Sequence, residues 1–582
     1  MNPNWDLSYL YKGFDDPAFL ADLKRFPEEI KVEQAILDGG DDPQTKLEKL
    51  TDQQEVLGAL SDRLSSFCNL TQAVDANNAD ATKYLNVLDV IFNDSRIVSS
   101  AITRYIGSLP NLEDLIAASP KLQKVAFHLR ESAENAHHTI PEAVEPWILE
   151  MSLSGGSAFS LLRDKLDSTH TANYRGQEIP LSAVRGLAYD ADASVRRDAY
   201  EAEIASYKKM ELPMSYCLNA VKMEARTLSK AKGYPSVLDM TLSDSRMDRA
   251  TLDAMLTAIR EYLPHFRRYM KAKAKLLGHQ NGLPFYDLFA PVGQNVHTYT
   301  VEEAREMLVR LMGQFTPEMG KFIDNAFEQR WIDIYPREGK TGGAFCSPVH
   351  FADRSLVMTN FTGSFSDVST IAHELGHAWH NRCLAGLPYS LIDTPMPLAE
   401  TASIFNEQLL AHMVLKDASP DEQLSLLEGN LMETNQTIVD IYSRYLFETE
   451  VIDTRADHAM SVDELKDAML RAQEASYGDG LDPEIRHPYM WACKSHYYSS
   501  GYNFYNFPYA FGELFAKGVF AQYLQKGAAF VPDYCRLLRS CGSGTIADVA
   551  ASVGIDVRNP DFWRSSLEVV KGNIDKFCEL VK

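Results

Sequence analysis

The chain has 582 residues, enough for several domains, and its 45% hydrophobic and 24% charged residues are typical of a globular protein and exclude a fibrous or disordered one. Its 57 basic and 80 acidic residues give a net charge of −23, which argues against nucleic acid as a partner because phosphates are repelled. No apolar run approaches the roughly 18–20 residues that span a bilayer, so we expect no membrane association.

The N-terminus and the cysteines indicate the compartment. Residues 1–6 include neither a basic segment nor an apolar one, so we expect no secretory signal. The 8 cysteines are scattered and form no C-x-x-C pair, which is typical of isolated thiols in a reducing environment. We therefore predict a cytoplasmic protein, and the sequence gives no sign of an obligate protein partner.

Apolar residues at three- and four-residue steps indicate helices along most of the chain, so we predict a mainly α fold. A first division falls near residue 190. It separates an N-terminal helical sub-domain (1–190) from a second domain (191–582), and the absence of a flexible linker predicts that the two pack as one body. In the second domain, residues 252–277 predict an amphipathic helix.

Two later helices have recognisable start signals. Thr300 with Glu303, and Ser461 with Glu464, each fit a capping box, in which two side chains satisfy the free N–H groups of a helix start. Between them, residues 421–457 form a long helical pattern without proline.

Strand signals are few. The clearest is the segment 355–361, Ser-Leu-Val-Met-Thr-Asn-Phe, which follows the glycine-rich residues 339–345. We predict one small β-sheet here within the helical body.

The pattern H-E-x-x-H follows this sheet, from His373 to His377. On a helix, positions i and i+4 lie on one face about 5–6 Å apart, so both imidazoles can bind one tetrahedral metal. Glu374 then faces the open position of the metal, where it can act on water instead of binding the ion. Ser366 or Asp367 is expected to cap this helix.

A third metal ligand is expected, because catalytic zinc commonly has three protein ligands. Glu400 lies 23 residues after His377, in the expected first turn of another helix, and Glu407 lies seven residues further along nearly the same face. A carboxylate among Ala, Leu, Ile and Phe is poorly explained as a surface residue. We predict that Glu400 binds the metal and that Glu407 orients a ligating histidine. His380 is the alternative ligand, but it lies about 10.5 Å along the helix from His373.

A second informative segment, residues 495–512, is rich in hydroxyl-bearing rings. Such rings often belong to a core, but their density beside Gly501 and Pro508 predicts a loop that lines a cleft. Tyrosine O–H and histidine N–H groups are the donors that a metallopeptidase needs where the oxyanion develops.

Together these motifs resemble the M3 family of zinc oligopeptidases, and in particular its oligoendopeptidase F branch. The segments that carry the resemblance are His373–His377, Glu400, residues 342–346, residues 495–512, and the terminal segments 5–8 and 554–557. The resemblance therefore covers essentially the whole chain. It implies a large helical body with a deep substrate channel, the small sheet near the metal-binding helix, one Zn²⁺ per chain, and hydrolysis of short peptides.

The resemblance also assigns the reacting groups. It makes His373, His377 and Glu400 the metal ligands and Glu374 the general base, which are the roles expected from the spacing.

The resemblance adds roles in the tyrosine-rich segment. The oxyanion and substrate tyrosines of the family fall on Tyr502 and Tyr509, and its loop histidine falls on His496. One branch has a further tyrosine where this chain has Asn506, so Tyr505 is expected to take that role in substrate binding.

The glycine-rich segment is expected to touch the substrate as well. By resemblance, Gly343, Ala344 and Phe345 lie beside the peptide backbone.

We thus expect a metalloendopeptidase, with residues 191–582 as its catalytic domain. Two alternatives stay open. One is a helical metallocarboxypeptidase, which needs a basic residue such as Arg444, Arg486 or Lys494 to hold a terminal carboxylate. The other is a catalytically silent peptide-binding relative, and the intact Glu374 counts against it.

Overall fold

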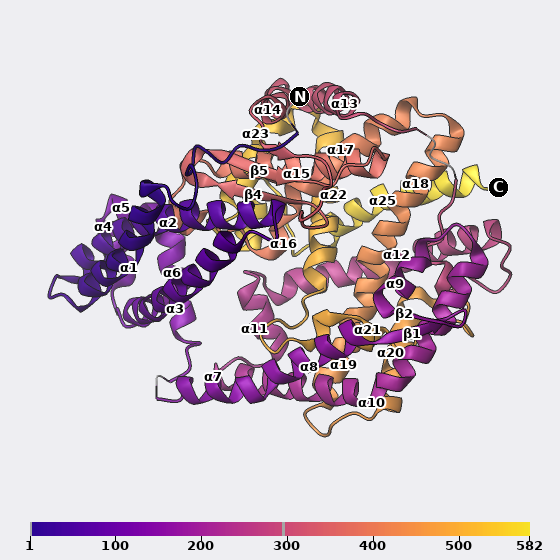
Figure 1. Cartoon of the computed structure of the whole chain (residues 1–582), viewed down its shortest axis with the longest axis horizontal. Coiled ribbons are helices and arrows are strands. Elements are labelled where there is room, and N and C mark those ends of the chain that lie inside the picture. The colour runs from indigo at the N-terminus through magenta and orange to yellow at the C-terminus, as the bar shows by residue number, and fades with distance from the viewer. Residues whose placement is uncertain (1–2, 142, 294–296) are drawn as a thin grey trace. The chain divides into compact units, whose positions relative to one another are not determined.

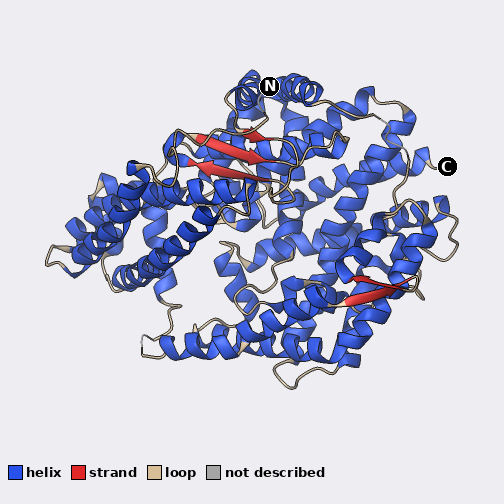
Figure 2. Cartoon of the chain, viewed as in Figure 1, coloured by secondary structure: helices blue, strands red, loops and turns tan. Residues whose placement is uncertain are grey.

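The computed structural model describes residues 3–141, 143–293 and 297–582 (Figure 1). Helices make up most of it, and strands are confined to two small sheets (Figure 2). The predicted mainly α fold is confirmed. None of the described helices combines the length and the apolar character needed to cross a bilayer.

The chain forms two compact units, each built from three segments. Unit 1 comprises Met1–Thr139, Val296–Met413 and Gln522–Gly554, and unit 2 comprises Ile140–Asn295, Val414–Ala521 and Ile555–Lys582. The division predicted at residue 190 does not coincide with these boundaries and stays a prediction.

Unit 1 contains a helical N-terminal part and the helices around the larger sheet. The helices that lie wholly or mostly in it are α1 (Pro17–Asp38), α2 (Pro43–Val74), α3 (Ala79–Gly107), α4 (Leu112–Ala118), α5 (Pro120–Lys124), α6 (Ala126–Ala136), α13 (Val301–Phe315), α14 (Pro317–Glu328), α15 (Phe365–Leu384), α16 (Met396–Ala399), α17 (Thr401–Asp417), α23 (Val531–Ser540) and α24 (Ile546–Ala551).

Unit 2 is a second helical body. Its helices are α7 (Glu145–Ser154), α8 (Gly156–Thr169), α9 (Leu181–Gly186), α10 (Ala193–Ala231), α11 (Val237–Asp244), α12 (Arg249–Leu276), α18 (Pro420–Asn435), α19 (Ile441–Thr454), α20 (Val462–Tyr477), α21 (Met490–Cys493), α22 (Phe507–Lys526) and α25 (Pro560–Leu580). The predicted helix over 252–277 corresponds to α12.

Two of the three predicted helix starts coincide with capping residues in the structure. Both predicted boxes form, Thr300 with Glu303 at α13 and Ser461 with Glu464 at α20. The start predicted for α15 is wrong by two residues: Ser364 is the cap, and its backbone and side chain exchange hydrogen bonds with those of Asp367. An early cap is possible because Gly363, with φ of +104°, turns the chain just before it.

The long helical pattern over 421–457 is also confirmed, as α18 followed directly by α19. One π-helical stretch, Gln436–Asp440, joins the two. Such stretches add a residue to a turn and are frequent near functional sites.

The larger sheet contains strands β3 (Ile332–Asp333), β4 (Phe345–Val349) and β5 (Arg354–Met358) in the order β3-β5-β4. β4 and β5 are antiparallel, with Phe345 opposite Met358, and β4 is an edge strand. Helix α15 packs against β4 and β5. The predicted small sheet beside the H-E-x-x-H helix is therefore confirmed.

A second sheet was not predicted. β1 (Thr171–Tyr174) and β2 (Gln177–Pro180) form a hairpin around Arg175 and Gly176, which have φ angles of +51° and +85°. Two four-residue strands are too short to show a clear alternation, and only the glycine in the turn indicates the hairpin.

The first helix contains a buried acid. Glu33 of α1 is 4% exposed, and burial raises its pKa to about 7. In the unfolded chain the pKa of a glutamate is about 4.3, so the unfolded state releases this proton at lower pH than the folded state. Stability is therefore lost as pH rises from about 4 to about 7 and stays reduced above that.

We predict that Glu33→Gln stabilises the chain at pH 8.5 by about 1–2 kcal/mol, less than the full pKa shift because the new amide is itself a polar group that must be buried. The gain should be much smaller at pH 5, where the buried carboxyl is already neutral. Urea denaturation followed by circular dichroism at both pH values measures it. Glu28→Gln, at an exposed ion pair with Lys31, is the control and should change little. An equal effect of Glu33→Gln at both pH values would contradict the account.

Candidate active site

Helix α15 presents the two histidines of the H-E-x-x-H motif on one side. Ile371, Ala372 and Leu375 are buried and fix the orientation of the helix. His373 and His377 are one turn apart, with ring centroids separated by 4.9 Å. The local sequence thus provides two of the three expected ligands.

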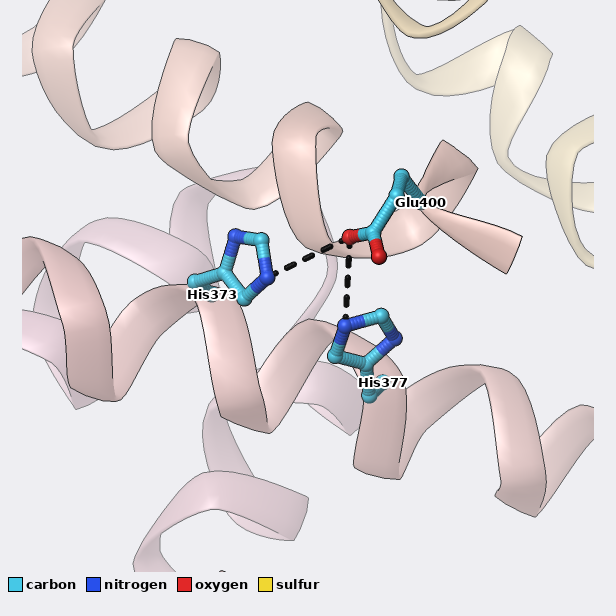
Figure 3. Close-up of side chains that lie close together, drawn as sticks. All are labelled: His373, His377 and Glu400. Atoms are coloured by element: carbon cyan, nitrogen blue, oxygen red, sulfur yellow. Dashed lines mark ion pairs between the residues drawn. The ribbon is translucent and has the colours of Figure 1, made fainter. Parts of the chain in front are cut away.

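Glu400 completes the cluster (Figure 3). Its Oε2 atom lies 3.3 Å from Nε2 of His373 and 3.3 Å from Nε2 of His377. Ligands bound tetrahedrally at 2.0–2.1 Å are about 3.3 Å from one another, so these spacings fit a zinc ion. Two imidazole nitrogens and one carboxylate oxygen are also a donor set that suits zinc. The three residues can therefore hold such an ion.

The sequence predicts Glu400 in the first turn of a helix. In the structure it lies just before that helix. It ends the short helix α16 and precedes α17, and its carbonyl accepts the N–H of Ile404. The hydroxyl of Ser403 donates to its Oε2 at 2.8 Å. Glu400 is thus held from its backbone and from its side chain.

A close contact between α15 and α17 brings Glu400 to the histidines. A Cβ atom on Gly376 would lie 2.5 Å from the carbonyl oxygen of Ala402 and 2.6 Å from Cα of Ser403. Only glycine allows the two backbones to approach this closely. The amide of Asn406 adds a further link, since it donates to the carbonyl of Ala372.

Glu407 contacts His373, as predicted. Its Oε1 lies 2.5 Å from Nδ1 of His373. A carboxylate oxygen accepts the hydrogen of Nδ1, so Nε2 is the nitrogen that faces Glu400 and is left for a metal ion when one binds. Burial disfavours charge on His373, but its hydrogen bonds to Glu400 and Glu407 outweigh burial and raise its pKa to about 10.

The same interactions act on Glu400. Burial disfavours its charge, but hydrogen bonds to both histidines hold its pKa well below the usual range. With no metal present, the cluster thus binds a proton between its carboxylates and imidazoles, which means that the arrangement favours a positive charge at its centre.

Glu374 lies next to these histidines on α15 and is 6% exposed. Burial raises its pKa, and the positive charges of His373 and His377 only partly oppose this. A carboxylate with a raised pKa is a better proton acceptor near neutral pH. Its position and its chemistry both fit a general base.

His380 takes no part in the cluster. It is buried, its Nε2 lies 3.1 Å from the carbonyl of Leu538, and burial lowers its pKa to about 4. It is therefore a neutral ring that donates to a backbone carbonyl, consistent with its distance along the helix from His373.

The glycine-rich segment leads into the edge strand β4. Gly343 adopts φ of +80°, and its carbonyl accepts a hydrogen bond of 2.8 Å from the side-chain amide of Asn360. Ala344 follows, and Phe345 begins β4. The outer edge of β4 has no partner strand among the described residues, so its backbone can pair with an extended chain.

The tyrosine-rich segment belongs to unit 2, and its rings form a cluster. The ring centroid of Tyr505 lies 5.1 Å from His496, 5.9 Å from Tyr502 and 5.8 Å from Tyr509. Tyr502 is 69% exposed, so its hydroxyl is accessible to a ligand. The predicted residues thus form two groups. The candidate metal ligands His373, His377 and Glu400 form the metal cluster in unit 1, and the rings of His496, Tyr502, Tyr505 and Tyr509 form the ring cluster in unit 2.

Asn506 has a role that the sequence did not indicate. Its Oδ1 accepts a hydrogen bond of 3.1 Å from Arg444 and lies 3.0 Å from Nδ1 of His496. Arginine can only donate, so this atom is the amide oxygen and Nδ1 of His496 must carry the hydrogen. Burial also lowers the pKa of His496. Burial therefore favours the neutral ring, which presents an acceptor at Nε2.

A buried ion pair also fixes Asn503 in the tyrosine-rich segment. Nζ of Lys222, which is fully buried, contacts Oε1 of Glu448 at 2.6 Å and donates to Oδ1 of Asn503 at 2.9 Å. Asn503 and Asn506 thus fix the backbone on either side of Tyr505. These partners come from helices far away in sequence, so no local pattern predicts them.

The basic residues considered for a terminal carboxylate differ from one another. Arg444 is paired with Asp440, and Arg486 with Glu474. Lys494 has no carboxylate oxygen within 4.0 Å in the part of the chain that the structure describes. Two of the three cations are therefore already neutralised.

Comparisons with known proteins agree with this geometry. The family described as Peptidase family M3 matches residues 186–569. The oligoendopeptidase F homolog of Lactococcus lactis subsp. lactis is 24% identical, over 99% of this chain and 97% of its own. A crystal structure of a peptidase from Chlamydophila abortus has a TM-score of 0.86 at 23% identity, covering 100% and 99% of the two chains. That of oligoendopeptidase-F from Enterococcus faecium has a TM-score of 0.68 at 18% identity, covering 97% and 98%.

We predict that Gly376→Ala weakens zinc binding about tenfold or more, because the added Cβ separates α15 from α17 and moves Glu400 from the histidines. Competition with a chromogenic chelator measures the affinity. Gly429→Ala in α18 is the matched control, since a Cβ there meets nothing within 4 Å. Unchanged zinc affinity in the Gly376 variant would show that the close contact does not position Glu400.

Proposed function

The chain belongs to peptidase family M3, and we propose that it is a zinc-dependent endopeptidase that hydrolyses short oligopeptides. Membership in the family makes it a metallo-oligopeptidase. Zinc-dependent catalysis is supported by the convergence of His373, His377 and Glu400 at spacings that fit a tetrahedral metal site. Glu374 lies beside them on α15. The name oligoendopeptidase F, which its full-length relatives carry, supports cleavage at internal bonds.

We propose one zinc ion per chain, held by the two histidines and Glu400 with its fourth position open. When bound, the ion supplies the Lewis acidity that polarises a peptide carbonyl and makes a nearby water more acidic. Glu407 keeps Nε2 of His373 directed at the ion through its hydrogen bond to Nδ1.

Glu374 is the proposed general base. Its buried carboxylate takes a proton from the attacking water and later delivers it to the leaving amine. The raised pKa suits both steps, because the group must accept the proton and then release it near neutral pH.

Tyr502 and Tyr509 are the proposed donors to the developing oxyanion. Each hydroxyl in such a position contributes about 10²–10³ in rate. His496 is expected from the resemblance to donate to the oxyanion as well, but the geometry supports another role, since its Nδ1 hydrogen is used by Asn506 and Nε2 of the neutral ring accepts. We therefore propose that His496 accepts a hydrogen bond from an N–H of the substrate.

The substrate backbone is proposed to pair with the free edge of β4. Main-chain hydrogen bonds to an edge strand hold an extended peptide largely regardless of its side chains, as an oligopeptidase requires. Gly343, Ala344 and Phe345 lie at the start of that edge, and Tyr505 is proposed to contact the substrate from the ring cluster.

We propose a cytoplasmic location for this activity. All 8 cysteines are free thiols, and several are buried, as expected for a protein in a reducing compartment.

Glu374→Gln is predicted to lower kcat at least about 10³-fold, because the amide cannot take the proton, while zinc stays bound at one ion per chain. Hydrolysis of a quenched fluorescent peptide and elemental analysis measure the two quantities. Glu302→Gln, an exposed glutamate in α13, is the control and should keep normal activity. Full turnover in the metal-loaded Glu374 variant would exclude the assignment of the base.

Product mapping separates the endopeptidase from the two alternatives. We expect internal bonds of an octapeptide to be cut equally well when its termini are free and when they are acetylated and amidated. Mass spectrometry of early products detects the difference. Release of single C-terminal residues from the free peptide only would indicate a carboxypeptidase, and no cleavage by the zinc-loaded chain would indicate a silent relative.

A further inference from the structure

Unit 2 contains a groove with a volume of about 730 Å³ that includes none of the residues assigned above. Its walls come from the last turns of α10, the first turn of α11, the start of α12, α19 and the residue Phe504. A volume of this size lies within the range of about 300–1,000 Å³ that is typical of sites for small ligands.

The groove is lined with positive charge. Arg226, Lys230, Arg249 and Arg455 line it, against one acidic residue, Asp453. This excess is opposite in sign to the chain as a whole, which has 80 acidic and 57 basic residues. A concave surface with one sign of charge concentrates ligands of the opposite sign.

Two of these guanidinium groups are fixed without being neutralised. Nη1 of Arg226 donates to the carbonyl of Ile452 at 2.9 Å, and Nε of Arg455 donates to the carbonyl of Asn219 at 3.0 Å. Over the described ranges, no carboxylate oxygen lies within 4.0 Å of the side-chain nitrogens of Arg226, Lys230 or Arg455, whereas Nε of Arg249 lies 3.6 Å from Oδ1 of Asp253. Each fixed guanidinium therefore keeps its full charge and further N–H donors for a ligand.

Aromatic side chains form the remaining wall. Tyr234, Tyr445 and Phe504 line the groove, and the rings of Tyr445 and Phe504 are 5.7 Å apart. Rings beside cations suit a ligand that carries both charge and apolar surface. Because the cations come from three separate helices, they suit several separated anionic groups better than one compact phosphate.

We propose that this groove binds acidic oligopeptides, with side-chain carboxylates on the cations and an aromatic or apolar residue against the rings. The inference rests on the membership of the chain in a peptidase family, but not on the metal cluster, since all lining residues belong to unit 2.

The groove also adjoins the segment that carries the candidate tyrosines. Phe504 has a left-handed backbone with φ of +51°, and the hydroxyl of Thr241 in α11 donates to the carbonyl of Asn503. A bound peptide would thus contact Phe504, which is two residues from Tyr502. This connects the new site to the ring cluster.

The test measures binding to the full chain carrying Glu374→Gln, which prevents cleavage. The probe is acetyl-Asp-Asp-Tyr-Asp-amide, whose only charges are its side chains, and acetyl-Asn-Asn-Tyr-Asn-amide is the neutral probe. Isothermal titration calorimetry in 50 mM and 300 mM salt gives the affinities. Lys230→Glu with Arg249→Glu changes two exposed groove residues, and Lys208→Glu with Lys209→Glu makes the same charge change outside the groove on α10.

We expect the acidic probe to bind at least about tenfold more tightly than the neutral probe, and to lose at least about tenfold in the groove variant and at high salt. The control variant should bind within about twofold of the parent, and Arg226→Gln should weaken binding without altering the helical content. Equal affinity for both probes, or equal losses in the groove and control variants, would overturn the proposal. Tight binding of pyrophosphate but not of the acidic peptide would overturn the peptide assignment. Because zinc is not needed, binding should persist after chelation, so this test can fail independently of the catalytic proposal.

Discussion

The close approach of α15 and α17 is the constraint on which the metal cluster depends. The two histidines follow from helical spacing alone, but the carboxylate must come from a different helix. Gly376 lets the backbone at Ala402 come within a distance that any side chain would prevent. Glu400, two residues earlier, then lies 3.3 Å from both imidazoles. The packing of the two backbones therefore sets the geometry of the site. The side chains of His373, His377 and Glu400 need only small rotations to reach a common metal position.

Charge is organised differently around the two clusters. In unit 1, burial disfavours charge on His373, but hydrogen bonds to the carboxylates of Glu400 and Glu407 outweigh it and raise the pKa of the ring to about 10. The surroundings of this ring therefore favour a bound cation. In unit 2, buried pairs such as Lys222 with Glu448 are neutral overall, and they act by fixing the asparagines of the ring segment. Breaking a buried pair is usually far more harmful than replacing both partners, so such pairs specify a geometry more than they add stability.

Much of the metal cluster could be predicted from the sequence because its signals are local. The H-E-x-x-H pattern needs only helical periodicity, and the small sheet beside it needs only a short apolar run. Glu400 stands out in the sequence because a carboxylate among apolar residues is unusual, but the sequence predicts it inside a helix, whereas it lies just before α17. The sequence does not indicate why a glycine stands at position 376. The requirement for glycine follows from the backbone of α17 beside it, which only the structure shows.

The parts that the sequence could not predict depend on partners far away along the chain. Asn506 was noted only as a missing tyrosine, yet its oxygen determines the tautomer of His496 through a contact from α19. The groove likewise joins cations from α10, α12 and α19 that share no motif. Residues of this kind become visible only when the helices are packed, because charge and hydrogen-bond geometry, not spacing, define them.

The proposed catalysis depends on the binding of one zinc ion by His373, His377 and Glu400 together. X-ray absorption at the zinc edge of the zinc-loaded chain tests it most directly. We expect one ion per chain with two imidazole nitrogens and two oxygens at about 2.0–2.1 Å, and a changed oxygen shell in Glu400→Gln. A sulfur neighbour at about 2.3 Å, or a spectrum without imidazole scattering, would contradict it.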